Sequence, residues 1–359
     1  MTMLFFTSPI GLGHASRDVA IADELVRAGI SIDDIIFVTG GVAYQYIRDN
    51  GYHAVDAYRG KSIDASNGTF KNKLLWLLDY ITFYRECKDV ASSIIKEYRP
   101  ELIVSDEDFA SISLASALDI KNILITDIFE SRFLNGLPSL LEKVLNRYLR
   151  SIVAKADMVI APMHKDEHAH NLDADNITYV GPIVRMVSKD RDSLRREFGF
   201  DGYRVILVSV GGTSSGRFLI EKAIDTYTKI ADSLSIPTKM VIVSGPSIDI
   251  KSIKRCDGVE LHGYVRNLHE MIYASDLLIS LAGRSTMDEA RAYGTPAIFI
   301  PIKGHFEQES NARINGFSHE DIDRLDHLML KYLAYERMVG RYEYGASKAA
   351  GMIIRLMPR

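Results

Sequence analysis

Short apolar runs alternate with stretches of helical periodicity through the first half of the chain. Runs of apolar residues bounded by turn residues predict buried strands at residues 4–7, 35–39, 102–105 and 123–126. Helical periodicity predicts helices at residues 15–28 and from about residue 70 to residue 98. A glycine-containing loop at residues 8–14 separates the first strand from the first helix.

The second half repeats this alternation. Strands are expected at residues 205–210, 240–244, 277–281 and 297–300. A glycine loop at residues 211–216 leads into a helix expected at residues 218–234. Two such arrays predict two doubly wound α/β domains. We place them at residues 1–185 and 186–340, followed by a C-terminal helix at residues 341–359 that packs back on the first domain.

The stretch from residue 275 to residue 312 combines a strand, a glycine turn and a helix start. Gly283 follows the strand, and Ser285 or Thr286 is expected to cap a helix that ends at Gly294. Backbone N–H groups at a helix N-terminus neutralise a phosphate or diphosphate without a metal. A capping box that only ends the helix remains the alternative.

Composition narrows the classes of function. The chain has 359 residues, a net charge of −4 and only two cysteines. This charge gives no global reason to expect a nucleic-acid partner. Two cysteines exclude a disulfide framework and a cysteine-rich zinc site, and they fit the reducing cytoplasm. No run of 18 apolar residues is present, so neither secretion by an obvious route nor a membrane span is expected.

Four segments carry a family resemblance over nearly the whole chain: GLGHASR at 11–17, YVGPIVR at 179–185, GGT at 211–213, and residues 282–308. They resemble the motifs of GT-B glycosyltransferases, specifically the group around the bacterial undecaprenyl-linked N-acetylglucosaminyltransferase of peptidoglycan synthesis and its archaeal relatives. The resemblance implies two Rossmann-like domains that face a central cleft. The first would bind the acceptor and the second a nucleotide sugar.

The resemblance also implies a site for a UDP-sugar donor, which is a co-substrate and not a resident cofactor. Uracil would lie against Tyr264 and Val265, ribose on Glu289, and sugar hydroxyls on Glu307 and Gln308. The remaining donor-binding positions are Gly13, Arg185, Gly211, Gly212, Thr213, Gly283, Arg284, Ser285 and Thr286. For the acidic-Gln pair and Arg185 the alternatives are a solvated loop and a surface salt bridge. Arg284 replaces a small residue of the family, and it either contacts a phosphate or carboxylate or points to solvent.

His14 is the expected catalytic base. It precedes a helix, and the positive field of that N-terminus is expected to keep the imidazole neutral near pH 7. Asp106 corresponds in the resemblance to a carboxylate that orients this histidine. Because Glu107 and Asp108 stand beside it, Asp106 could equally cap the following helix.

The expected stereochemistry of the transfer rests on the residue at position 281. Retaining enzymes of this fold usually carry a glutamate eight residues before the ribose glutamate, and here that position is Leu281. We therefore expect inversion, without a metal. Two other functions remain open: a non-hydrolysing UDP-sugar 2-epimerase and a non-catalytic nucleotide-sugar-binding subunit.

The acceptor is expected to be lipid-linked or a glycan. Residues 140–155 place Leu141, Val144, Leu145, Tyr148 and Ile152 at helical spacing, with basic residues between them. Such a helix either lies peripherally on an anionic membrane or buries its apolar face in the domain. Residues 74–84 carry the same ambiguity. The expected location is the cytoplasm, including the cytoplasmic face of the membrane.

Overall fold

The computed structural model describes residues 1–59, 65–167 and 174–358, and these form two compact units. The N-terminal unit comprises Met1–Ser62, Asn72–Arg185 and Glu343–Arg359. The C-terminal unit comprises Ile63–Lys71 and Met186–Tyr342. Residues 65–71 therefore belong to the second unit although the described residues on either side of them in sequence belong to the first, which the sequence pattern does not indicate.

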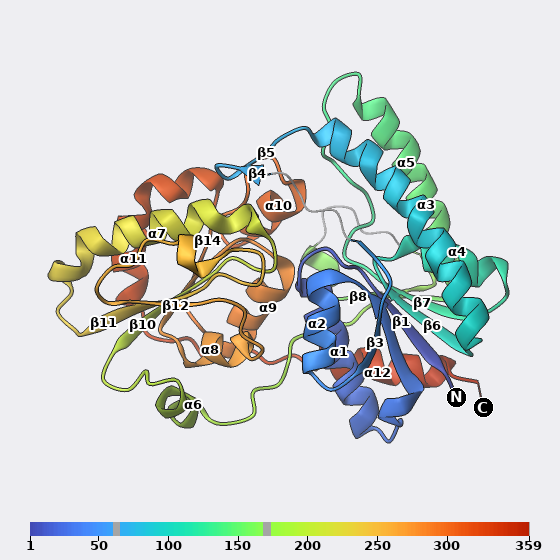
Figure 1. Cartoon of the computed structure of the whole chain (residues 1–359), viewed down its shortest axis with the longest axis horizontal. Helices are drawn as coiled ribbons and strands as arrows, with labels where there is room; N and C mark the ends of the chain where they lie inside the picture. Colours follow the sequence, from blue (N-terminus) through green and yellow to red (C-terminus); the bar gives the residue numbers. More distant parts are fainter. Residues whose placement is uncertain (60–64, 168–173, 359) are drawn as a thin grey trace. The chain divides into compact units, whose positions relative to one another are not determined.

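The N-terminal unit is built on a parallel sheet flanked by helices (Figure 1). Its seven strands lie in the order β3-β2-β1-β6-β7-β8-β9. The strands are β1 (Met3–Thr7), β2 (Ile35–Thr39), β3 (His53–Asp56), β6 (Leu102–Asp106), β7 (Lys121–Ile125), β8 (Met158–Ala161) and β9 (Ile177–Tyr179). The helices are α1 (Gly13–Arg27), α2 (Gly41–Asp49), α3 (Lys73–Tyr98), α4 (Phe109–Ala117), α5 (Ser139–Val153) and α12 (Gly345–Leu356). The C-terminal helix α12 packs against α1 in this unit.

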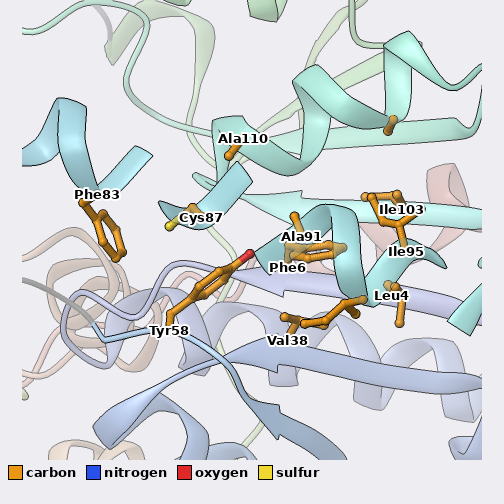
Figure 2. Packing of buried hydrophobic residues seen from close by; sticks show 12 residues of the cluster. Leu4, Phe6, Val38, Tyr58, Phe83, Cys87, Ala91, Ile95, Ile103 and Ala110 are labelled. Atoms are coloured by element: carbon orange, nitrogen blue, oxygen red, sulfur yellow. The ribbon is translucent and has the colours of Figure 1, made fainter. Parts of the chain in front are cut away.

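One part of the core of this unit lies between the sheet and α3 (Figure 2). Leu4 and Phe6 of β1 pack with Ile103 of β6 against Ala91 and Ile95 of α3. Every residue of β1 is buried, as expected for a central strand covered on both faces. This core fixes the strand ends that carry the site.

The C-terminal unit contains a parallel sheet of five strands in the order β12-β11-β10-β13-β14. The strands are β10 (Arg204–Ser209), β11 (Thr238–Val243), β12 (Val259–His262), β13 (Leu277–Ser280) and β14 (Ala297–Phe299). The helices are α6 (Arg191–Glu197), α7 (Arg217–Ile230), α8 (Leu268–Ala274), α9 (Arg284–Tyr293), α10 (Phe306–Ile314) and α11 (Leu325–Leu333). A small antiparallel hairpin, β4 (Ala65–Ser66) and β5 (Thr69–Phe70), also belongs to this unit.

Expected and observed elements agree best where strands are fully buried. The strand expected at residues 35–39 has those bounds, and the other expected strands differ by one or two residues at one or both ends. The sequence pattern missed β3, β4, β5, β8, β9 and β12. Of these, β9 and β12 contain no fully buried residue, so they lack the continuous apolar run that marks a central strand. Within the described residues, every helix is too short or too polar to cross a bilayer.

Candidate functional site

Two neighbouring strands of the N-terminal sheet bring His14 and Asp106 together. The strand β1 pairs with β2 on one side and with β6 on the other, and its last residue, Thr7, lies opposite Asp106 at the end of β6. The loop after β1 leads into α1, where His14 is the second residue. In open α/β sheets, the point between oppositely directed crossovers forms the ligand crevice at the carboxyl ends of the strands.

Asp106 is the centre of a buried charged cluster. Its Oδ1 lies 2.9 Å from Nδ1 of His14, and its Oδ2 accepts a hydrogen bond of 2.8 Å from Nε of Arg17. A terminal nitrogen of Arg17 bonds Oδ1 as well, so the guanidinium grips both carboxylate oxygens. Asp106 is fully buried and Arg17 is 5% exposed. Burial raises the pKa of Asp106, but Arg17 and His14 outweigh burial and hold this pKa well below its ordinary value.

The helix after β6 is capped by a different aspartate. Oδ1 of Asp108 accepts 3.0 Å hydrogen bonds from the backbone N–H groups of Ala110 and Ser111, at the start of α4. The alternative of Asp106 as this N-cap is therefore wrong. Asp106 ends β6 two residues before the cap, which leaves its carboxylate for His14 and Arg17.

Glu107 places a second carboxylate beside His14. Its Oε2 lies 3.7 Å from Nε2 of His14, and its Oε1 accepts a 3.2 Å hydrogen bond from Oγ1 of Thr126. The backbone of Glu107 has a φ of 55°, a left-handed conformation that is costly for a side chain of this type. Burial raises the pKa of Glu107, which His14 only partly opposes.

The expectation of a neutral imidazole is wrong for the unliganded chain. Burial lowers the pKa of His14, but the carboxylates of Asp106 and Glu107 outweigh it and raise the pKa to about 9. The helix N-terminus carries only about half a positive charge. A bonded carboxylate at 2.9 Å therefore has the larger effect.

A small pocket opens next to this cluster, with a volume of about 20 Å³. Its walls come from the β1–α1 loop, from α3, and from the turn between β6 and α4. The lining residues are Ser8, Pro9, Ile10, Tyr80, Phe83, Tyr84, Cys87, Glu107, Asp108, Phe109 and Ala110. Four of them are aromatic and two are acidic, and the described lining includes no lysine or arginine. A pocket of this volume holds about one water molecule, so its lining is an aromatic and acidic surface beside His14 and not a cavity for a whole ligand.

In the C-terminal unit the expected donor residues follow four different strands. Gly211, Gly212 and Thr213 follow β10, and Gly283 follows β13; these strands are neighbours, with Ser209 opposite Ser280. Tyr264 and Val265 follow β12, and Glu307 and Gln308 follow β14. Because all strands are parallel, these loops lie at one edge of the sheet. The strand order places the topological switch point between β10 and β13.

The start of α9 differs from the expected capping. Gly283 is the N-cap, and Ser285 and Thr286 lie inside the first turn, so the prediction that either caps the helix is wrong. Neither Asp nor Glu stands in that first turn. Glu289 lies in the second turn and is 5% exposed. The helix start therefore presents its dipole and N–H groups without an acidic side chain in its own first turn.

Arg284 makes an ion pair inside its own helix. Its Nε donates a 2.9 Å hydrogen bond to Oδ2 of Asp288, and the Arg284 side chain is 10% exposed. The expectation that it points to solvent is therefore wrong, whereas a carboxylate contact is present. Asp288 neutralises much of the charge that Arg284 would offer to a phosphate.

Side chains of α10 hold the loop after β14 and the turn before α9 in place. Oε1 of Gln308 accepts a 3.0 Å hydrogen bond from the backbone of Ile302, which leaves its amide nitrogen as the donor for a ligand. Asn311 is absent from the site residues expected from the sequence. It donates a hydrogen bond of 3.2 Å to the carbonyl of Ala282 in the β13–α9 turn.

Arg185 does not belong to the unit that carries these loops. It lies in the N-terminal unit, is 8% exposed, and places its guanidinium 5.5 Å from the ring centre of Tyr46. Such a cation–π contact stabilises packing. Gly13, also expected near the donor, is the first residue of α1.

Arg17 is the main member of the site that sequence reasoning missed. The spacing from His14 could have identified it. Residues three apart on a helix face the same side, so Arg17 lies beside the expected catalytic histidine.

Comparisons with known proteins agree with this architecture. Residues 205–314 match the glycosyltransferase family 28 C-terminal domain. A protein of Methanosarcina mazei named an uncharacterized glycosyltransferase is 26% identical over 332 residues, covering 88% of this chain and 83% of that protein. The UDP-N-acetylglucosamine–N-acetylmuramyl-(pentapeptide) pyrophosphoryl-undecaprenol N-acetylglucosamine transferase of Caldicellulosiruptor saccharolyticus is 22% identical over 312 residues, covering 84% and 78% of the two chains.

Solved structures share the fold. The glycotransferase of kitacinnamycin superposes with a TM-score of 0.69 at 14% identity and covers 99% of both chains. A spinosyn rhamnosyltransferase complexed with thymidine diphosphate superposes with a TM-score of 0.62 at 14% identity, covering 99% of this chain and 96% of that chain. The predicted GT-B fold is thereby confirmed, and the matching family 28 domain together with the named relatives confirms the assignment to glycosyltransferases.

Proposed function

We propose that the protein is an inverting, metal-independent glycosyltransferase that moves a sugar from a UDP-sugar to a hydroxyl of a lipid-linked or glycan acceptor. The observation that carries this proposal is the His14–Asp106–Arg17 cluster at the switch point of the N-terminal sheet. A histidine whose Nδ1 is held by a buried carboxylate leaves Nε2 to take a proton from a hydroxyl.

The donor would lie on the loops at the carboxyl edge of the C-terminal sheet. The N–H groups at the start of α9 and in the Gly211–Gly212 loop offer positive charge to the diphosphate, and this positive charge also stabilises the departing UDP. Glu289 would accept bonds from the ribose hydroxyls, and Gln308 would donate its amide to the sugar. The Caldicellulosiruptor relative is named for UDP-N-acetylglucosamine, which is therefore the first donor to test.

Inversion follows from the residue before the α9 turn. Leu281 is apolar and 7% exposed, and it stands where retaining relatives usually carry a glutamate. A leucine side chain offers no lone pair to a glycosyl centre. The acceptor oxygen would therefore attack the anomeric carbon directly, as the bond to UDP breaks and His14 takes the hydroxyl proton.

The acceptor side of the proposal rests first on the pocket beside His14. Tyr80, Phe83, Tyr84 and Phe109 offer ring faces, and Glu107 offers a carboxylate at the end nearest the histidine. Because the pocket is small, an acceptor would contact these groups at its surface, where aromatic faces and a carboxylate can meet one edge of a sugar ring.

It rests second on α5, whose inner side is unusually polar. Buried Glu142 accepts 2.7 and 2.9 Å hydrogen bonds from the backbone of Phe133 and Leu134. Buried Asn146 accepts 2.8 Å from the backbone of Ser131. Because these polar residues occupy the buried side, part of the apolar stripe faces outward: Val144 and Tyr148 are exposed, while Ile152 is buried.

Both α5 and α3 carry exposed apolar side chains. The two helices lie side by side in Figure 1 and are joined by a 3.2 Å hydrogen bond between the hydroxyls of Tyr84 and Tyr148. We define the α3–α5 patch as the exposed residues Leu74, Leu75, Leu78, Leu137, Leu140 and Val144. Exposed Lys143 and Arg147 interleave with the patch on α5. Apolar residues flanked by basic ones favour peripheral contact with an anionic membrane.

The transfer proposal is tested by incubating the protein with UDP-sugars, with and without membrane lipids. UDP release that depends on lipid supports transfer. Interconversion of the sugar at its second carbon would instead show an epimerase, and binding without either reaction would show a non-catalytic subunit.

The patch makes a separate prediction. Leu140→Ser combined with Val144→Ser is expected to lower the fraction of protein bound to phosphatidylglycerol vesicles about tenfold, because two apolar side chains no longer enter the interface. Leu118→Ser serves as the control, since Leu118 is 54% exposed in the same unit but lies outside the patch. Equal vesicle binding by the double variant and the control would contradict the role of the patch.

The raised pKa of His14 predicts the pH dependence of transfer. The base form is the neutral ring, so kcat/KM of the free enzyme should rise with pH toward the His14 pKa of about 9. Glu107→Gln removes a carboxylate that raises this pKa, and the rise should therefore move to lower pH. The His14 pKa from an NMR titration checks the same shift.

Glu97→Gln is the matched control, because Glu97 is an exposed glutamate in the same unit. If the pH profile of kcat/KM is the same for Glu107→Gln as for the wild type, Glu107 does not raise the pKa of His14.

A further inference from the structure

The hairpin β4–β5 lies between β3 and α3 in sequence, yet it packs as part of the C-terminal unit. Its neighbours there are the residues that follow β14. Those residues lead directly into α10, which carries Glu307 and Gln308.

Backbone hydrogen bonds join the hairpin to Lys303. The N–H of Phe70 donates a hydrogen bond of 2.8 Å to the carbonyl of Lys303. The N–H of Lys303 donates one of 2.7 Å to the carbonyl of Gly68. Thr69 and Lys303 form a parallel bridge. The loop after β14 is thus held in an extended conformation beyond the end of its own strand.

The turn of the hairpin is tightly packed. Gly68 has a φ of +72°, and a Cβ placed there would lie 2.9 Å from the side chains of His319 and Phe218. Nδ1 of His319 donates 2.8 Å to the carbonyl of Pro301. The turn therefore requires glycine at position 68. Through His319, the hairpin also contacts the loop after β14 from a second side.

Phe70 touches the cap of α10. Its side chain is 4% exposed, and its ring centre lies 6.1 Å from that of His305. His305 is the N-cap of α10, with Nδ1 facing the backbone N–H of Gln308 at 3.5 Å. The start of α10, including the turn that presents Gln308, is thus braced by the ring of Phe70.

We propose that Phe70 is a positioning residue for the donor sugar, one that holds the His305 cap so that Gln308 meets the sugar hydroxyls. This inference rests on the proposed function, in which Gln308 bonds the sugar and not the uridine diphosphate. It makes the β4–β5 hairpin part of the sugar specificity of the C-terminal unit. Loosening this brace should weaken recognition of the sugar and leave recognition of UDP intact.

The test compares two ligands by calorimetry. For Phe70→Leu, the Kd of UDP-N-acetylglucosamine is expected to rise about tenfold, while the Kd of UDP stays the same, because only the sugar contact is displaced. In turnover, KM for the donor should rise more than kcat falls. Gly68→Ala, which disturbs the same hairpin by a different route, should give the same split between ligands.

Phe198→Leu is the matched control, since Phe198 is a partly buried aromatic of the same unit that pairs with Phe200. It should change neither Kd. Equal weakening of both ligands by Phe70→Leu, or unchanged affinity for both, would overturn the positioning role while the proposed function stands. If the wild-type chain binds neither ligand, the donor assignment itself fails, and the inference fails with it.

Discussion

Replacing His14 by alanine is expected to lower kcat/KM for sugar transfer by roughly 10²- to 10⁴-fold, the usual contribution of a positioned general base. The acceptor hydroxyl would then lose its proton acceptor during attack. UDP affinity should stay at the wild-type value, because the proposed donor loops belong to the C-terminal unit. Acceptor-dependent UDP release and calorimetry with UDP measure the two quantities.

His53→Ala provides the control for this substitution. His53 is an exposed histidine of β3 in the same unit, so its loss removes an imidazole without touching the cluster around Asp106. Full transfer activity in the His14→Ala variant would show that the base is another group.

Replacing Asp106 by asparagine is expected to reduce both transfer and stability. Arg17 is 5% exposed, and this substitution removes the charge that both its hydrogen bonds to Asp106 depend on. Leaving one partner of a buried ion pair uncompensated typically costs about 3 to 5 kcal/mol. Burial and the neighbouring Asp106 raise the pKa of Asp18, so relief of that repulsion offsets part of the loss. Urea unfolding measures the change in the free energy of unfolding.

The same variant should lower the pKa of His14, since Asp106 is the first carboxylate that raises it. An NMR titration of His14 reports this shift independently of folding stability. Asp33→Asn is the control, because Asp33 is exposed near the start of β2. A free energy of unfolding within about 0.5 kcal/mol of wild type, the range of ordinary surface substitutions, would contradict the role assigned to Asp106.

The architecture was predictable because its signals are local. Fully buried parallel strands read as continuous apolar runs, and the glycine loops after β1, β10 and β13 mark the strand ends. Once the strands are known to be parallel, residues that follow them must share an edge of the sheet. His14, Gly211 and Gly283 could therefore be assigned to strand ends from the sequence.

Charge states and helix faces were less predictable, because they depend on neighbours distant in sequence. The pKa of His14 is set by carboxylates more than ninety residues away. The exposure of part of the apolar stripe of α5 depends on Glu142 and Asn146, which bind the backbone of residues 131–134 on the buried side of the helix. The membership of the β4–β5 hairpin in the C-terminal unit likewise has no local signal.

By itself, the sequence determined the two α/β domains, the glycine loops at the strand ends and the candidate residues on them. It could do so because periodicity and turn chemistry act within a few residues. Only the tertiary structure decided that Asp106 and not Asp108 faces His14, that Arg17 completes the pair, and that Arg284 binds Asp288. These outcomes depend on distances of a few ångströms between side chains, because electrostatic and hydrogen-bond energies change steeply over that range.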